Sequence, residues 1–330
     1  MNKPVKIEEY RNGILENVHE CLIYAVDGSR NTVMKRGEPS HPIFYRSAMK
    51  PIQAIPAFQS NVIEQYGLNS NEAALFMGSH RGEEYHQETL IRLLEKLNVK
   101  ENDFVCGHAY PLNEAAKHRF IAERKEKRKL FHNCSGKHLG LMAAARAYGY
   151  PIDGYEQLGH PIQQHILSIL ADLSEVAASD IASGKDGCGL PVHAVPLKNM
   201  ALSYLKFVKP ELISDTKTAN AVSAVGQVMN KHPEMIAAHR FTCSTLLLDE
   251  NIIAKGGAQG VYCFALKKER ISFAIKVLSG SELVWSLLVA ELLKKISYDN
   301  KGTIEALYEL RPPIIYSDGN DVVGEVVVRI

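Results

Sequence analysis

The sequence carries almost no net charge and no long apolar run, and these two absences exclude several classes of function. Its 38 lysines and arginines nearly balance 37 aspartates and glutamates, which leaves a formal net charge of +1. Such a balance gives no reason to expect nucleic acid or an anionic membrane as a partner. The longest apolar candidate, LVWSLLVAELLKKI at 283–296, is shorter than a membrane span and contains Ser286 and Glu291. We interpret it as a helix of the core.

Several signatures of cofactor and metal chemistry are also missing. The sequence has no HExxH, no Walker A, no GxGxxG after a strand and no CxxC, so nucleotide binding and a zinc finger are disfavoured. The first residues, MNKPVKIEEYRNG, lack the apolar region of a signal peptide, and we expect a cytoplasmic protein with six reduced cysteines. The basic run from Lys117 to Lys129 contains two glutamates and is interpreted as a solvated helix face.

Strand patterns lie near both ends of the chain, and helical patterns lie between them. Strands are expected at 20–37, with a hairpin turn at Asp27-Gly28, and at 251–266, 270–278 and 321–330. Helices are expected at 47–59, 85–99, 135–149, 161–176, 217–231, 282–296 and 303–310. With no repeat and no evident linker, the pattern predicts one α+β domain over 1–330. Its mixed or antiparallel sheet comes from both chain ends and is flanked by helices.

Ser47 and Lys50 stand three residues apart in FYRSAMKP and form a candidate nucleophile and base. If this segment is helical, both lie on one face with Cβ atoms about 5–6 Å apart, and Ser47 lies at or near the N-cap. A lysine can take the proton of a serine only if burial or a nearby positive charge lowers its pKa. From these residues alone, a capping serine followed by a surface lysine is the commoner arrangement.

Two further stretches carry residues that could take part in proton transfer or anion binding. MGSHRGEE at 77–84 places Ser79 in a turn of small residues, where it could equally be the N-cap of the next helix. AKGGAQGVY at 254–262 places Lys255 at a strand end before glycines, where it could neutralise a substrate anion or carry a proton. A solvated lysine on an edge strand is the alternative.

Two cysteines lie in glycine-rich or turn-like stretches. HNCSGKHLG at 132–140 places Lys137 and His138 close to Cys134, and KDGCGLPVH at 185–193 sets Cys188 between glycines. Cysteines in such turns of a reduced protein are candidates for a thiolate metal site or for a nucleophile. Two unrelated small buried thiols are the other interpretation.

Taken together and in order, these stretches resemble one family. RSAMKPIQA, GSHRGE, CSGKH, DGCGLP, RFTC and AKGGAQGVY are similar to the motifs of the rhizobial-type L-asparaginases, the Ser-Lys asparaginase II family. The resemblance extends from about residue 15 to 330. It implies a fold similar to that of serine β-lactamases and glutaminases, hydrolysis of L-asparagine to L-aspartate and ammonia, and a homodimer.

The resemblance also implies roles for individual residues. It suggests two catalytic pairs, Ser47 with Lys50 and Ser79 with Lys255, and a zinc site formed by three side chains. The zinc ligands would be Cys134, Lys137 and Cys188. Zinc would either orient substrate or hold loops in place, and its affinity should rise with pH because a lysine ligand must lose its proton. Substrate binding is expected at Arg46, His80, Arg81, His138, Gly256 and Gly257.

The expected mechanism has Ser47 attacking the side-chain amide while neutral Lys50 takes the proton. Ser79 and Lys255 would relay a second proton, and backbone N–H groups near Ser47 and the Gly256-Gly257 turn would bind the oxyanion. The alternatives are another Ser-Lys hydrolase, such as a glutaminase or a D-amino-acid amidase or peptidase, and a non-catalytic zinc or amino-acid-binding protein.

The sequence departs from the family pattern in three places. Arg81 stands directly after the SH of the second motif, Gly256 and Gln259 replace expected residues, and Cys243 is shifted by one position in RFTC. These departures affect substrate details more than the class of reaction.

Overall fold

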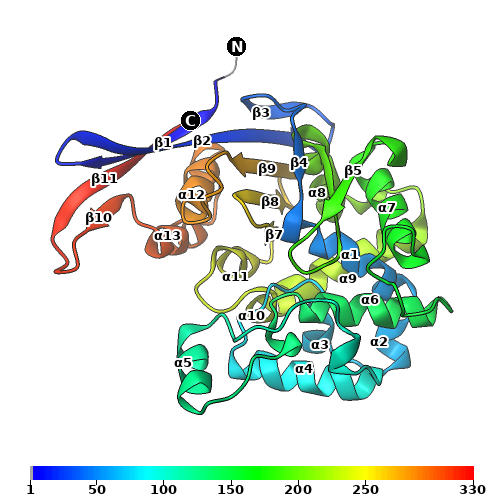
Figure 1. Ribbon diagram of the computed structural model, residues 1–330. Coiled ribbons are helices and arrows are strands. Elements are labelled where there is room, and N and C mark those ends of the chain that lie inside the picture. Colours follow the sequence, from blue (N-terminus) through cyan, green and yellow to red (C-terminus); the bar gives the residue numbers. More distant parts are fainter. Residues whose placement is uncertain (1–2) are drawn as a thin grey trace. The chain divides into compact units, whose positions relative to one another are not determined.

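The computed structural model describes residues 3–330, and the chain divides into two compact units that are each built from separate stretches (Figure 1). The first unit comprises the chain up to Ala48, Val195–Val208 and Arg240–Ile330. The second comprises Met49–Ala194 and Lys209–His239. The expectation of a single catalytic domain over 1–330 stays a prediction.

The first unit is organised around an antiparallel sheet to which both ends of the chain contribute. Its strands lie in the order β10-β11-β1-β2-β9-β8-β7, and β3 pairs with β2. In Figure 1 the blue and red strands lie side by side, as the pairing of β1 with β11 requires. The predicted α+β class with a sheet from both chain ends is therefore confirmed. The strands are β1 (Val5–Arg11), β2 (Ile14–Asp27), β3 (Thr32–Arg36), β7 (Ile252–Gly256), β8 (Val261–Leu266), β9 (Ile271–Val277), β10 (Ile314–Tyr316) and β11 (Val322–Arg329).

Helices cover both faces of this sheet, and the alternation of side chains along the strands shows which helix covers which face. The hydroxyl of Ser272 on β9 donates to the carbonyl of Ala201 on α8 (Leu197–Val208) at 2.7 Å. Tyr262 on β8 instead contacts Trp285 on α12 (Trp285–Lys295), with ring centroids 5.1 Å apart. Ser272 pairs with Ala265, three residues from Tyr262, so the two contacts lie on opposite faces. The unit also contains β4 (Pro42–Phe44), α11 (Thr242–Leu247) and α13 (Lys301–Leu310).

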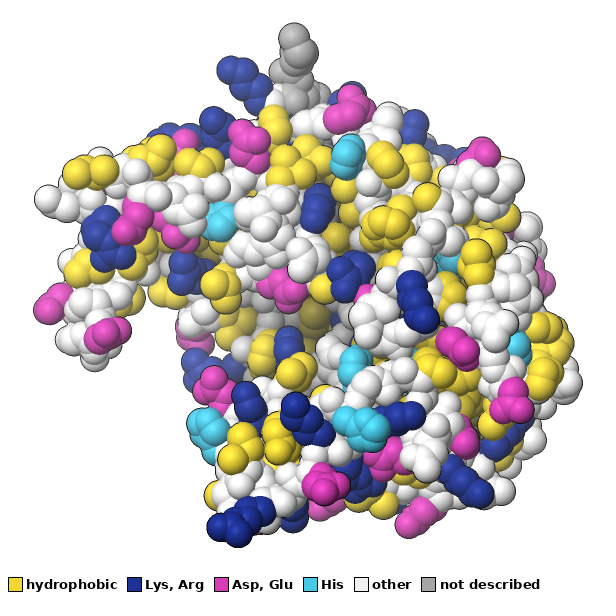
Figure 2. Space-filling view, in the orientation of Figure 1, with side chains coloured by type: hydrophobic (Ala, Val, Ile, Leu, Met, Phe, Trp, Pro, Cys, Tyr) yellow, Lys and Arg dark blue, Asp and Glu magenta, His cyan; other side chains and the backbone are white. Residues whose placement is uncertain are grey.

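The end of the sheet formed by β1, β2, β10 and β11 carries large apolar side chains in contact with solvent. Ile14 is 72% exposed, Val322 67% and Tyr316 50%. In Figure 2 yellow side chains alternate with charged ones over this part of the first unit. Exposed apolar groups of this kind are common at protein–protein contacts.

The second unit is mainly helical and is centred on α1 (Lys50–Gln59). This helix packs against α6 (Ser135–Ala147), α7 (Pro161–Ser174) and α9 (Thr216–Lys231). Every residue of α1 except Phe58 is buried, including the lysine at its first position. The remaining elements are α2 (Val62–Gln65), α3 (Ser70–Ala74), α4 (Glu84–Leu97), α5 (Glu114–Ala122), α10 (Pro233–Ile236), β5 (Ala182–Lys185) and β6 (Pro191–Pro196).

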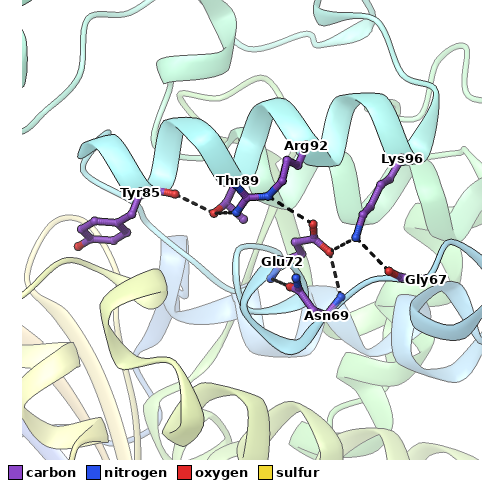
Figure 3. Close-up of polar contacts among 7 residues, drawn as sticks. All are labelled: Gly67, Asn69, Glu72, Tyr85, Thr89, Arg92 and Lys96. Atoms are coloured by element: carbon purple, nitrogen blue, oxygen red, sulfur yellow. Dashed lines mark hydrogen bonds and ion pairs between the residues drawn. The ribbon is translucent and has the colours of Figure 1, made fainter.

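A buried carboxylate ties α3 to α4 in this unit (Figure 3). Glu72 has no exposed surface, and its carboxylate accepts from the N–H of Asn69 at 2.9 Å and from Lys96 at 2.7 Å. Asn69 in turn accepts from the N–H of Glu72, which completes a capping box at the start of α3. Arg92 approaches the same carboxylate at 3.8 Å. These contacts hold α3 and α4 together, and the turn that contains Ser79 lies between these two helices.

The predicted helices and strands are present, but β1, β6 and α8 were not predicted, and two predicted elements differ in detail. The α-helix begins at Lys50 rather than at Ser47, because a 3-10 turn over Arg46–Met49 precedes it, and the N-cap is Met49. The basic run is helical only up to Ala122, where α5 ends, so its second half is not the helix face that we expected. Within residues 3–330, no helix is both long and apolar enough to cross a bilayer.

Candidate functional site

Lys50 is the buried amine at the centre of the candidate site in the second unit. Its side chain has no exposed surface, and its Nζ lies 2.5 Å from the carbonyl oxygen of Gly78, 3.2 Å from that of Asn133 and 2.9 Å from Ser79 Oγ. A neutral amine could donate to both carbonyls and accept the hydroxyl proton of Ser79, whereas an ammonium would donate to all three. The direction of the Lys50–Ser79 hydrogen bond therefore depends on the charge of the lysine.

The turn that presents Ser79 is held by close backbone contacts. A Cβ on Gly78 would lie 2.6 Å from the carbonyl oxygen of Met235, so only glycine fits there. The N–H of Ser79 donates to the carbonyl of Ile236 at 2.7 Å. These contacts with α10 leave Ser79 half-buried, with its hydroxyl directed at Lys50.

In the first unit, Ser47 lies in a short strained segment. It is half-buried within the 3-10 turn, and Arg46 immediately before it has a φ of 50°. Such a φ is uncommon for a residue with a side chain, and strained residues cluster at functional sites. A Cβ on Gly257 would lie 2.4 Å from the carbonyl oxygen of Tyr45 and 3.2 Å from the N of Ala48. The predicted glycine turn therefore packs directly on the backbone at both sides of Ser47.

The structure contradicts the expectation that the N–H groups of Gly256 and Gly257 bind an oxyanion. The N–H of Gly256 donates to Cys243 Sγ at 3.1 Å, and that of Gly257 donates to the carbonyl of Val261 at 2.7 Å. Both N–H groups already have acceptors, one on α11 and one on β8, so these glycines contribute mainly through their small size. Lys255, beside them, is buried and donates to the carbonyl of Gly256 at 2.8 Å.

Cys134, Lys137 and Cys188 come together in the second unit as predicted. Cys134 is the N-cap of α6, Lys137 lies one turn along that helix, and its Nζ is 3.3 Å from Cys188 Sγ. A hydrogen bond from the Cys188 thiol, with the charges of Lys50 and Lys137, holds the pKa of Cys134 well below its ordinary value despite burial. Burial alone would lower the pKa of Lys137, but the two neighbouring sulfurs outweigh it and raise that pKa.

This donor set fits a zinc ion in chemical type. Two sulfurs and an amine converge, and thiolate and nitrogen ligands suit Zn²⁺. Across residues 3–330, no group of three or more His, Cys, Asp and Glu side chains is placed to hold a metal. A metal at this cluster would therefore depend on Lys137 as its third ligand.

His80 and His138 have no exposed surface, and substrate binding by either one stays a prediction. His80 Nε2 lies 2.8 Å from Ser135 Oγ, and His138 Nδ1 lies 2.6 Å from the hydroxyl of Tyr155. Burial, together with nearby positive charges, lowers the pKa of both imidazoles well below the ordinary value, so both are neutral. Through these contacts the two histidines connect α6, which carries Cys134 and Lys137, to the neighbouring segments. Arg81, by contrast, is half-buried.

The sequence analysis missed two groups that complete this part of the site. The carbonyl of Asn133 contacts Lys50, and Tyr155 holds His138 while accepting from the N–H of Val105 at 3.3 Å. Asn133 directly precedes the CSGKH motif, so its position was a usable signal. Tyr155 lies in an irregular loop without a motif, and only the folded chain brings it to His138.

Comparison with known proteins assigns the chain to a family. The model of the L-asparaginase II family matches residues 7–328. No curated protein matches the chain. Among solved structures, a β-lactamase from Mycobacterium bovis matches at 11% identity and a TM-score of 0.43, covering 83% of this chain and 94% of that one. Unliganded simvastatin synthase from Aspergillus terreus matches at 14% identity and a TM-score of 0.39, covering 78% and 87%. Both TM-scores lie below 0.5, so the assignment rests on the family match: the chain belongs to the L-asparaginase II family.

Proposed function

We propose that this protein hydrolyses L-asparagine to L-aspartate and ammonia with a serine nucleophile and a lysine base. Membership of the L-asparaginase II family indicates an amidohydrolase. The observation that carries the finer proposal is the buried amine of Lys50 lying 2.9 Å from Ser79 Oγ. Burial disfavours the ammonium form of Lys50, and the contact with Ser79 Oγ is short enough for proton transfer between the two groups.

Lys50 would take the hydroxyl proton as the serine oxygen forms a bond to the amide carbon. The same proton would then pass to the leaving nitrogen, so ammonia departs and an acyl-enzyme remains. Water would hydrolyse this ester by the reverse proton path. Ser79 is the serine in contact with Lys50, and Ser47, three residues before Lys50 in the chain, remains the other candidate nucleophile. Lys255 is proposed as a second proton carrier.

Zinc is proposed as the metal of the Cys134–Lys137–Cys188 cluster. When bound, it would supply a Lewis-acidic centre. The chain contributes the two sulfurs and the amine, and α6 fixes Cys134 and Lys137 one turn apart. The carbonyl and the carboxylate of Asp186 accept hydrogen bonds from the N–H groups of Gly189 and Gly187 at 2.9 and 2.7 Å, and these bonds hold the turn that carries Cys188.

The proposal is tested by ammonia release from L-asparagine, L-glutamine and a D-amino-acid amide, and separately by the opening of the β-lactam ring of a penicillin, which releases no ammonia. Faster turnover of L-asparagine than of the others supports it. Preference for glutamine or a D-amino-acid amide would assign a different hydrolase to the same residues. If no substrate turns over but asparagine binds, the protein is a binding protein. The homodimer and the cytoplasmic location stay predictions, and light scattering of the purified protein measures the first directly.

A further inference from the structure

A pocket in the helical unit is lined by none of the residues of the Lys50 site or of the Cys134–Lys137–Cys188 cluster. It has a volume of about 370 Å³ and lies between the loop Glu156–Leu158 and strand β5, with Pro191 on its wall. This volume lies within the range of small-molecule sites, at about 300–1,000 Å³. Pro191 is buried, whereas every residue of β5 is exposed. The pocket therefore opens along one strand.

The register of β5 shows that it offers free backbone groups to this pocket. β5 is an edge strand that pairs with β6, with Lys185 opposite Pro191 and Ser183 opposite His193. The N–H of Asp186 bonds to the carbonyl of Leu190, and bonded pairs alternate along an antiparallel ladder. Gly184 is therefore bonded to β6, while the N–H and carbonyl groups of Ser183 and Lys185 point to the open edge. Proline, which has no N–H, lies opposite Lys185, where no donor is required.

Opposite charges stand in the same pocket. Glu156 comes from the loop and Lys185 from the strand. Neither side chain has an ion-pair or hydrogen-bond partner in the described part of the chain. A ligand with an ammonium and a carboxylate at the spacing of one carbon would find a partner for each, and the carboxylate could also accept from the open N–H groups of β5.

We propose that this pocket is a binding site for a free α-amino acid, held by its two charged ends and separate from the Lys50 site. Glu156 receives the ammonium, and Lys185 with the edge of β5 receives the carboxylate. Charge complementarity and volume favour a single zwitterion over a dicarboxylate or a diamine, each of which would leave one charge of the pocket facing a like charge.

The walls of this pocket continue directly into the cluster described above. β5 and β6 are the two strands that hold the Asp186–Leu190 turn, which carries Cys188. Glu156 follows Tyr155, whose hydroxyl holds His138. A Cβ on Gly189 would lie 3.2 Å from the side chain of Val105, so the turn is closely packed. An amino acid bound here would thus contact both segments that support the cluster.

The test is an NMR titration of the full-length protein with L-alanine, which has both charged ends and no amide to hydrolyse. Saturable shifts of the Ser183, Gly184 and Lys185 amides are expected. Succinate and putrescine, which carry charge of one sign only, should bind at least about tenfold more weakly. Equal shifts with all three compounds, or no saturable shift with L-alanine, would overturn the proposal.

Variants provide the second measurement. Lys185→Glu should weaken L-alanine binding about tenfold, and Glu156→Gln about threefold, since both groups are partly exposed and screened. Glu95→Gln and Lys231→Met, at exposed positions of α4 and α9, are the matched controls and should bind as the wild type does. Unchanged binding in Lys185→Glu would refute the site. The NMR titration follows the amides of β5 and does not require hydrolysis. Its result can therefore be interpreted even if the protein shows no asparaginase activity.

Discussion

The amine of Lys50 lies 2.9 Å from the hydroxyl oxygen of Ser79, and both come from the helical unit. The sequence motifs had suggested Ser47 as the partner of Lys50 and Lys255 as the partner of Ser79. The contact joins one member of each expected pair, 29 residues apart along the chain. Lys50 is thereby the residue on which the proposed chemistry depends most directly.

Replacement of Lys50 by arginine should abolish the proposed base. Arginine keeps the positive charge but does not lose its proton near neutral pH, so Lys50→Arg and Lys50→Met should both lower kcat by about 10²–10⁴-fold. Ammonia release from L-asparagine measures this, with exposed Lys198→Met as the control. Retention of most activity in Lys50→Arg would mean that the charge matters and proton transfer does not.

Replacement of each serine should separate the two candidate nucleophiles. The variant that lacks the nucleophile should form no acyl-enzyme when asparagine is mixed rapidly with the protein, because no ester oxygen is present. The other variant should still accumulate one, at a lower rate. Mass spectrometry of quenched Ser47→Ala and Ser79→Ala measures the adduct. An adduct in both variants would exclude both serines as the sole nucleophile.

Removal of either cluster sulfur should remove zinc. Cys134→Ser and Cys188→Ser should retain less than about a tenth of the zinc bound by the wild type, because a thiolate ligand contributes strongly to Zn²⁺ affinity. Elemental analysis after dialysis against zinc measures the metal. Cys21→Ala, in the sheet of the other unit, is the control. Equal zinc in all variants would place the metal elsewhere. Chelation of the wild type should raise KM while slow hydrolysis persists.

Adding one methyl group at Gly257 should disturb the segment of Ser47. Its Cβ would lie 2.4 Å from the carbonyl oxygen of Tyr45, so Gly257→Ala should cost about 1–3 kcal/mol of unfolding free energy and lower activity. Urea unfolding and the ammonia assay measure the two effects. At Gly107 a Cβ would meet nothing within 4 Å, so Gly107→Ala is the control. Equal stability of both variants would show that the 45–48 backbone adapts freely.

Acid should destabilise the helical unit through His86. Burial lowers the pKa of His86 to about 4, and the positive groups His239 and Arg81 act in the same direction, against the hydrogen bond to the carbonyl of Glu234. The unfolded chain, with a His pKa of about 6.5, binds the proton first, so stability present above that value is lost as pH falls toward 4. From about pH 7.5 to about pH 5 the loss from this group should be about 2 kcal/mol. Chemical unfolding of His86→Gln should show a correspondingly smaller loss, and exposed His118→Gln should not.

Much of this protein could be predicted from its sequence because the relevant signals are local. The 3.6-residue and two-residue patterns predicted most of the long helices and several strands, though not β1, β6 or α8, and six short motifs predicted the family. Cys134, Lys137 and Cys188 were predicted as a cluster from the family resemblance, and the structure brings them together. A motif identifies residue types, however, and does not say which backbone groups are already bonded.

Tertiary structure decided the rest. The start of the α-helix at Lys50, the occupied N–H groups of Gly256 and Gly257, and the complete burial of His80 and His138 all result from contacts between segments distant in sequence. Lys50 meets Ser79 because a glycine turn packs against α10, and this packing has no local signature. Local periodicity determines which helices and strands form. The residue that exchanges a proton with buried Lys50 depends instead on which segments, distant in sequence, pack around the amine and exclude water.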